Sequence, residues 1–541
     1  MSQLASLPPL LRNDPAVPSI LGANSGLVAV PDAARAYVLA GLASLSQRHP
    51  FVVAVPTTTD AEHLANDLRA FLGEDEVDVF PAWETLPFER ISPSVETMGR
   101  RLRVMWRLRE PDRMPRVLIA PVRAVVQRLG PHVEDVEPVT IRPGDQLDPT
   151  ELIERLVADG YRREYQVEHR GEVAVRGSIV DVFPSTADTP VRIDLWGDEV
   201  DRLTEFAVAD QRTTNDIPCV EIFGCRELLP TDEVRARATK LVATEPWGRE
   251  QWERLADGQT FEGMESWLPW LTADEHVILD LVPKDAQVVL LEPRRMRDRA
   301  GELLDEEASL ASSLATTWGV DPDREFPRLH LPFDRLLSHT GAPVWTMASA
   351  PESHDTTSIH ATGWDPVVGD GSRLVKQLNE LSRDGYRVVV CAEGKGTGAR
   401  VTASLNEAGM TVPFDEHGPG HPSSIGDVTK PGVRVIVQPL ERGFVLPSIK
   451  LAVLAESDVT GRRRAHRRAR PRAKRGSEGF FDDLKPGDHI VHYQHGVGRY
   501  GGMVKRAIGG VERDYLLLEY RGNDKLYVPS DQIDAVRHYT G

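Results

Sequence analysis

Cysteine and long apolar runs are both scarce in this sequence, and their scarcity excludes several classes of protein. Only three cysteines occur among 541 residues, and Cys219, Cys225 and Cys391 are spaced too irregularly for a disulfide framework or a zinc site. We expect all three to be buried thiols. No apolar run approaches the ~20 residues of a membrane-spanning helix. The N-terminus lacks the basic start and apolar stretch of a secretory signal, so we expect a cytoplasmic protein.

Positive charge is in deficit as well. The chain has 64 Lys and Arg against 82 Asp and Glu, which gives a formal net charge of -18. Such a surface repels phosphate on average, and this excludes a protein that coats nucleic acid along its whole length. Any basic patch must therefore be local.

One local cluster of positive charge stands out against this background. Residues 461–476 contain nine Lys or Arg and no acid, and they show neither helical nor strand periodicity. We interpret 461–480 as a basic, disordered linker and favour a solvated tether. Contact with DNA phosphates is the alternative. That contact would use Arg462, Arg463, Arg464, Arg467 and Arg468.

The length of the chain allows several hydrophobic cores. A chain of 541 residues exceeds the size that one core supports, so we expect three to five domains. Hydrophobic residues make up 40% and charged residues 27%, which is typical of a globular protein.

The first part of the chain has the pattern of a parallel α/β domain. Residues 51–56 and 117–122 are continuous apolar strands, and 60–72 between them is an amphipathic helix. Residues 286–293 form a further apolar strand that could complete the same sheet. We therefore predict a discontinuous first domain, 1–130 plus 229–340.

The intervening and following segments predict further domains. In 131–228, short alternating strands such as 173–183 and 191–200 predict an inserted α+β domain. In 341–460, a helix at 372–385 and apolar strands predict a third α/β domain. Those strands are 387–393, 434–440 and 451–456. Closely spaced turns in 481–541 predict a small all-β unit.

A nucleotide site is the first candidate for chemistry. We place a phosphate loop at 20–30, where Gly22 and Gly26 remain but Leu27 and Val28 stand in place of the lysine and the magnesium-binding hydroxyl. Without these groups we expect no ATP hydrolysis at this loop. The nearest candidate for the matching acid is Glu292, a single carboxylate after a strand, which is common by chance.

Other catalytic and metal signatures are weak. We find no Ser/His/Asp elbow, no HExxH motif and no convincing pair of carboxylates, so no catalytic residue is predicted. His489, His492 and His495 lie close together in the all-β unit. Without cysteine partners, we favour structural or surface histidines over a metal site.

Four longer motifs resemble a known family. They are 83-WETLPFERISPSVETMGRRL-102, 173-VAVRGSIVDVFP-184, 443-GFVLPSIKLAVLAESDVTG-461 and 487-GDHIVHYQHGVGRYGGM-503. Together they resemble the N-terminal half of the bacterial transcription-repair coupling factors (the Mfd family), over essentially the whole chain. The resemblance implies a multi-domain α/β fold. It comprises a degenerate P-loop domain similar to that of the repair protein UvrB, the inserted α+β domain, a third α/β domain and a small Tudor- or SH3-like β-barrel.

The resemblance also implies that the inserted domain binds UvrA through arginines on one face of its sheet. Arg176 occupies the matching position, and an earlier match falls on Arg162 or, after a shift of one, on Arg163. Ala174 stands where UvrB carries another arginine. Arginine pairs bidentately with carboxylates, although a solvated surface arginine is the simpler alternative. The implied UvrA-binding residues are Arg162, Arg163, Arg176, Asp181 and Phe183.

The final β unit resembles the RNA polymerase-interacting domain of CarD-type regulators. That domain pairs a sheet edge with the polymerase β-subunit, a docking mode that satisfies main-chain groups. Arg506 matches a polymerase-contacting arginine, whereas Tyr527 stands where CarD has a second one. The implied polymerase-binding residues are Val504, Lys505, Arg506, Ile508 and Tyr527.

The function implied by the resemblance is that of an adaptor between stalled RNA polymerase and UvrA. Family members continue into an ATP- and magnesium-dependent translocase on double-stranded DNA, whose motifs do not occur here, so we expect an N-terminal fragment with no cofactor of its own. One alternative is a UvrB-like module with residual nucleotide-dependent activity, against which Leu27 and Val28 argue. Another is a stand-alone regulator of polymerase.

Overall fold

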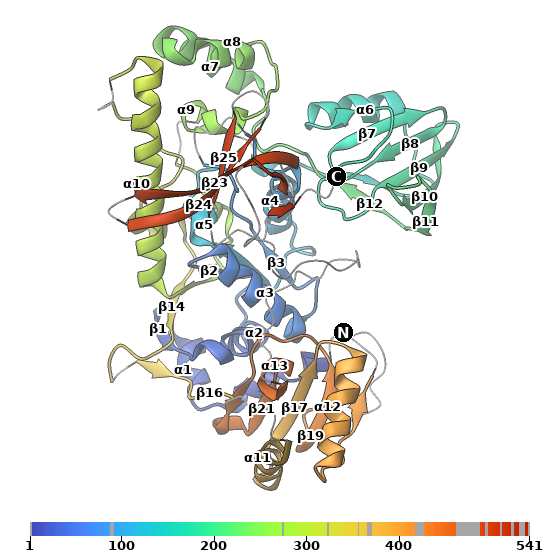
Figure 1. Ribbon diagram of the computed structural model, residues 1–541, viewed down its shortest axis with the longest axis vertical. Coiled ribbons are helices and arrows are strands. Elements are labelled where there is room, and N and C mark those ends of the chain that lie inside the picture. The colour runs from blue at the N-terminus through green and yellow to red at the C-terminus, as the bar shows by residue number, and fades with distance from the viewer. Residues whose placement is uncertain are drawn as a thin grey trace.

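The protein is built from several sheets with helices packed between and around them (Figure 1). The computed structural model describes residues 3–86, 91–131, 133–272, 275–321, 324–354, 356–364, 371–416, 427–460, 487–492, 496–508, 511–520, 524–529 and 536–538. Among these residues, no helix is both long and apolar enough to cross a membrane.

Seven described strands form the first sheet, and all of its neighbouring strands are parallel. The predicted parallel α/β pattern is therefore confirmed. In spatial order the strands are β15 (Thr357–Ser358), β1 (Gly26–Ala29), β14 (Val344–Ala348), β13 (Gln287–Leu291), β2 (Phe51–Val55), β4 (Val117–Pro121) and β3 (Val77–Val79).

The predicted end of the first domain at residue 340 is too early. Strands β14 and β15 lie beyond it, yet β14 pairs with both β1 and β13 in the first sheet. The segment 344–348 alternates buried and half-buried residues, so it lacks the continuous apolar run by which the other central strands were recognised.

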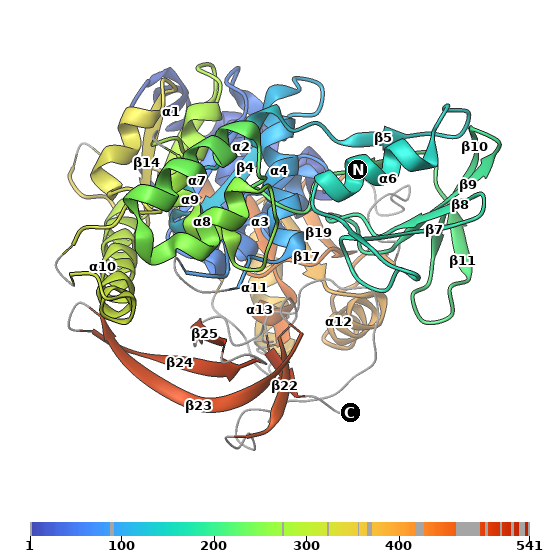
Figure 2. The same ribbon diagram turned by 90° about the horizontal axis from the view of Figure 1, so that it is seen from above.

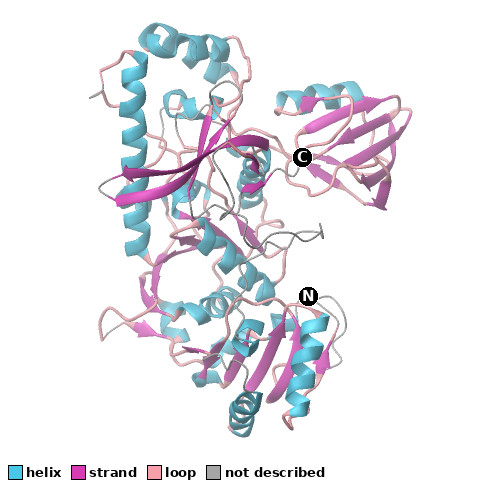
Figure 3. Ribbon diagram, in the orientation of Figure 1, coloured by secondary structure: helices cyan, strands magenta, loops and turns pink. Residues whose placement is uncertain are grey.

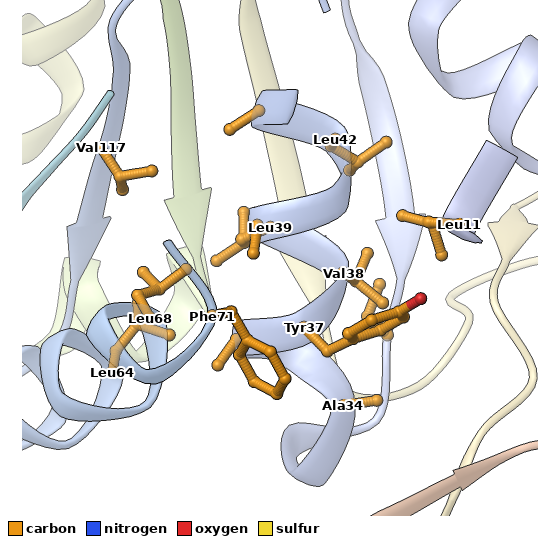
Figure 4. Packing of buried hydrophobic residues seen from close by; sticks show 14 of the residues in the cluster. Leu11, Ala34, Tyr37, Val38, Leu39, Leu42, Leu64, Leu68, Phe71 and Val117 are labelled. Atoms are coloured by element: carbon orange, nitrogen blue, oxygen red, sulfur yellow. The ribbon is translucent and has the colours of Figure 1, made fainter. Parts of the chain in front are cut away.

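Both faces of this sheet are covered. On one face lie α2 (Arg35–Leu45) and α3 (Thr58–Leu72), whose side chains, including Tyr37, Leu39 and Phe71, form a continuous core with the strands (Figure 4). On the other face lie α4 (Val95–Arg109) and α10 (Pro293–Trp318). The central strands are buried on both sides, which explains their uninterrupted apolar sequences.

The inserted segment forms a separate small unit (Figures 1 and 3). Its helix α6 (Pro149–Ala158) covers one face of a six-stranded sheet, which is antiparallel except for the β6–β7 pair. The strands are, in order, β11 (Thr213–Asp216), β10 (Glu199–Phe206), β9 (Val191–Trp196), β8 (Ile179–Val182), β7 (Glu172–Arg176) and β6 (Arg162–Arg163). A short pair, β5 (Val139–Ile141) with β12 (Val220–Ile222), lies where the unit joins the first domain.

A buried ion pair fixes the chain where it leaves the inserted unit. Arg101 on α4 donates from Nε to Glu227 over 2.6 Å, and neither side chain is exposed. The indole of Trp83 donates to the same carboxylate oxygen over 2.7 Å. Residues after Glu227 form α7 (Asp232–Thr244), α8 (Arg249–Ala256) and α9 (Leu268–Leu271), which enclose four tryptophans.

The third sheet packs against the far side of α2 and α3. Phe444 contacts Tyr37 with ring centroids 5.1 Å apart, so the first and third sheets share one core. Helices α11 (Gly371–Arg383) and α12 (Lys395–Glu407) cover the other face, and the predicted helix and three strands are confirmed. The strand order is β16 (Thr362–Gly363), β20 (Phe444–Leu446), β21 (Leu451–Leu454), β17 (Arg387–Ala392), β19 (Gly432–Val437) and β18 (Phe414–Asp415).

Five described antiparallel strands make up the C-terminal β unit, which lies beside α10 (Figure 2). Their order is β25 (Lys525–Pro529), β24 (Val511–Glu519), β23 (Gly496–Ile508), β22 (His489–His492) and β26 (Val536–His538).

The cysteines only partly follow the prediction. All three are free thiols, and Cys225 and Cys391 are buried. Cys219 is only half-buried, so the prediction of burial was wrong there.

Candidate functional site

The turn that corresponds to a phosphate loop does not lie at 20–30, where it was predicted. Gly22 is the last residue of α1 (Val17–Gly22), and Gly26, Leu27 and Val28 lie within β1. A phosphate loop follows the first parallel strand and precedes a helix. Here that connection is 30–34, which contains Pro31 and neither glycine nor lysine. Gly22 and Gly26 matched the glycine pattern of a phosphate loop, but they lie before β1 and at its start, and not after it.

A cluster of ion pairs occupies the carboxyl edge of the sheet at this turn. Arg35, at the start of α2, contacts Glu292, which follows β13. The same guanidinium donates to Ser349, after β14, over 2.8 Å and to Asp32 over 3.2 Å. The backbone N–H of Ser349 also donates to Glu292 over 2.9 Å. Three strand ends that would face a nucleotide are thus joined by side chains of the protein itself.

The electrostatics of this cluster match its geometry. Burial raises the pKa of Glu292, but hydrogen bonds from Ser349 and Arg35 and the charge of Arg35 outweigh it, so the net pKa is lowered. Asp32 also pairs with Arg442, which precedes β20 in the third sheet. Glu292 and Asp32 are thus both paired with guanidinium groups of the protein itself.

Replacing Glu292 with glutamine should lower the melting temperature at neutral pH, because Arg35 loses its carboxylate. Since the folded pKa is lowered, the ionised form stabilises the fold above the ordinary glutamate pKa of ~4.3, and this stabilisation is lost as the pH falls through the folded value. The gap between the melting curves of the two proteins should therefore close as the pH drops below ~4.3. The exposed Glu325, replaced likewise, is the control, and a gap independent of pH would contradict this account.

The inserted sheet has a second, open face on the side away from α6. Arg176, Asp181 and Arg192 lie on this face, while alternate residues such as Val180 and Ile193 pack on α6. Arg192 forms a bidentate pair with Asp181, at 2.7 and 2.9 Å. Arg176 contacts the same carboxylate, which is 1% exposed.

The predicted UvrA-binding residues divide into exposed and buried groups. Arg162, Arg163 and Arg176 are exposed, and Arg162 lies 3.4 Å from Glu172. Asp181 and Phe183 are buried, with Phe183 in a small apolar cluster that includes Ala174 and Phe206 on the same face as Asp181. The surface of this face is therefore formed by the exposed arginines, and Asp181 and Phe183 lie below them, so their role in binding UvrA stays a prediction.

Two exposed aromatic residues of the inserted unit were missed. Trp196, at the end of β9, is 84% exposed, and Tyr165, after β6, is 97% exposed. The signal for Trp196 was present, because in 191–196 the apolar residues alternate and Trp196 falls in the polar register with Arg192 and Asp194. Large aromatic residues in solvent commonly mark binding surfaces.

The C-terminal β unit presents an open strand edge. β23 pairs with β24 over 499–508, whereas β22 covers its other edge only over 496–499. Among the described strands, none pairs with that edge over 500–508. Val504 is half-buried and Lys505 is exposed, whereas the side chains of Arg506 and Ile508 lie outside the described part.

The remaining predicted residues are distributed differently. Tyr527 lies on β25, which β24 separates from β23, so the fold does not bring it to the open edge. His492 is buried, which lowers its pKa to about 4, and His489 is exposed. His495 and the arginines of 461–476 lie outside the described residues. In the part that the structure describes, no group of acids, histidines or cysteines could hold a metal ion.

Two family models match segments of the chain. One, described as the UvrB interaction domain, covers residues 139–228, which carry the open sheet face with Arg176 and Trp196. The other, described as the CarD-like/TRCF RID domain, covers residues 484–540, which carry the open edge of β23.

Curated relatives match nearly the whole chain. The transcription-repair-coupling factors of Mycobacterium bovis and Mycobacterium tuberculosis are each 36% identical over 560 residues, covering 94% of this chain and 44% of theirs. That of Bacillus subtilis is 27% identical over 542 residues, covering 95% of this chain and 45% of its own. The chain spans slightly less than half the length of these relatives. Over nearly all of its length it is thus homologous to the N-terminal half of the transcription-repair-coupling factors.

Proposed function

We propose that this chain is the docking half of a transcription-repair coupling factor. The inserted unit binds UvrA and the C-terminal β unit binds the RNA polymerase β-subunit. ATP-driven translocation on double-stranded DNA, with its ATP and magnesium, belongs to the part of the relatives that this chain does not span. The observation that carries the proposal is the pair of open surfaces, one in each segment that a family model matches.

The open face of the inserted sheet is suited to an acidic partner. Asp181 is shared by Arg176 and Arg192, so within this group of three one carboxylate faces two guanidinium groups, and Asp194 is a further acid beside Arg192. The buried Asp181 also holds Arg176 in place, which reduces the side-chain entropy lost on binding. Arg176 retains donors for a carboxylate on UvrA because its side chain is 44% exposed.

Trp196 supplies the apolar part of the same surface. It lies on the open face at the end of β9, two residues beyond Asp194, which pairs with Ile179 of β8. Tryptophan and arginine are the residue types that most often dominate binding energy at interfaces. We therefore propose that UvrA offers a carboxylate to Arg176 and an apolar depression to Trp196.

Arg176→Glu should weaken UvrA binding by about 10- to 100-fold, because the new carboxylate repels the carboxylate proposed on UvrA. Isothermal titration against purified UvrA measures the change. The thermal melt followed by circular dichroism should stay the same, since Asp181 keeps Arg192. Arg155→Glu on α6 reverses the same charge behind the sheet and should bind normally. A parallel loss of folding in Arg176→Glu would overturn its assignment to the interface.

Trp196→Ala should weaken UvrA binding by about tenfold or more without lowering the melting temperature, because a side chain that is 84% exposed contributes little to the core. Trp196→Phe, which keeps an aromatic ring, should recover most of the affinity. Equal binding by the alanine variant and the native protein would remove Trp196 from the surface while leaving the role of Arg176 intact.

Arg506→Glu should weaken binding to the polymerase β-subunit, because the open edge of β23 that carries it is the side available for an added strand. We expect a loss of roughly tenfold by biolayer interferometry. Lys525→Glu on β25, at the opposite edge of the sheet, is the matched control and should bind normally. If Arg506→Glu and Lys525→Glu weaken binding equally, the polymerase is attracted by the overall charge of the β unit, and the assignment to the β23 edge is wrong.

A further inference from the structure

A buried tyrosine joins the C-terminal β unit to the first domain. The hydroxyl of Tyr515, on β24, donates to the Oε1 atom of Glu306 on α10 over 2.9 Å. Tyr515 is only 3% exposed. Burial, followed by the charge and hydrogen bond of Glu306, raises its pKa, so the phenol keeps the proton that it donates.

The burial of Tyr515 comes from outside its own unit. Leu516 and Leu518 point into the core of the β unit, and successive residues of a strand point to opposite faces. Tyr515 therefore points away from that core. A small cavity beside it is lined by first-domain residues and by Tyr527 of the β unit. The first-domain residues are Glu84, Leu86, Arg123, Arg299, Leu303 and Glu306.

The receiving surface on α10 is a single stripe of the helix. Arg299, Leu303 and Glu306 are separated by four and three residues, so they lie one above another on the same side. A second contact comes from Ile91, which is 7% exposed and packs in the apolar cluster of the β unit with Ile490 and Leu516. The stripe and Ile91 together hold the unit at two points.

The docked surface overlaps the surface proposed for polymerase. Val504 on β23 lies directly opposite Tyr515 in the register, and α10 packs beside β23. Tyr527 lies opposite Leu517 and lines the cavity at the contact. Two of the predicted polymerase-binding residues are therefore part of, or adjacent to, the contact with the first domain.

We propose that α10 and RNA polymerase compete for the same side of the C-terminal β unit, so that the first domain holds the unit in a state that polymerase binding must displace. This inference rests on the proposed function for its external partner. The intramolecular contact itself stands on Tyr515, Glu306 and Ile91.

Competition of this kind has a measurable consequence. A partner that binds only the released unit has its apparent affinity reduced by the fraction of molecules that are released. If about one molecule in ten is released, weakening the α10 contact tightens polymerase binding by up to ~10-fold. If the α10 contact does not block polymerase, weakening it leaves the affinity for polymerase unchanged.

The test uses substitutions on α10, away from the proposed polymerase surface. Glu306→Arg removes the acceptor of Tyr515 and adds a charge beside Arg299 and Arg123. Asp305→Arg makes the same charge reversal on the adjacent, exposed residue of the helix and is the control. In the full chain, hydrogen–deuterium exchange over 511–519 and titration with the polymerase β-subunit are measured for both variants and the native protein.

Faster exchange in β24 together with about tenfold tighter polymerase binding, in Glu306→Arg only, is the expected result. Faster exchange with unchanged affinity would overturn the competition. Unchanged exchange would show that Glu306 does not hold the unit and would overturn it as well. Absence of polymerase binding by all three proteins would instead reject the proposed function, while the exchange data would still report on the contact.

Discussion

The arrangement of this protein depends on one apolar layer, formed by α2 and α3 between the first and third sheets. Tyr37 and Phe71 of this layer contact Phe444 of the third sheet, and the same cluster continues into the strands of the first. Because both sheets bury a face on the same two helices, their separation is fixed by close packing. Ion pairs also join the two sheets at one end of this layer. Asp32 pairs with Arg35 of α2 and with Arg442, which precedes β20 of the third sheet.

The two surfaces proposed for docking lie away from this centre, and a single carboxylate contacts each of them. Asp181 is buried beneath Arg176 and orients a positive group outward. Glu306 on α10 instead accepts a hydrogen bond from Tyr515 and holds that side of the C-terminal β unit against the first domain. The first arrangement lowers the entropy lost when a partner binds, whereas the second must be broken before a partner can bind there. The same type of group thus supports opposite states of the two units.

The sequence predicted those parts of the structure that local patterns determine. Strands such as 51–55 are buried on both faces and therefore read as continuous apolar runs, so the parallel sheet was found. Strand 344–348 alternates, and it was assigned to the wrong domain. The glycines at 22 and 26 imitated a phosphate loop, although the true turn at 30–34 has none. No local pattern could have placed Tyr515 on α10, because that contact joins residues more than two hundred positions apart.

An open strand edge tends to pair with other chains, so a protein that carries one needs a feature that limits such pairing. Among the described strands none pairs with the outer edge of β23 over 500–508, and an edge of this kind is a template for association with any extended chain, so natural proteins cover or charge it. Lys505 supplies charge there, and α10 packs beside the strand. The hydrogen bond from Tyr515 to Glu306 and the apolar contact of Ile91 hold this covering, and a partner that binds the edge must displace them. In the proposed competition, the contact with α10 protects the edge from other chains. It also selects the partner, because only a ligand that binds the β unit more strongly than the first domain does can expose the edge.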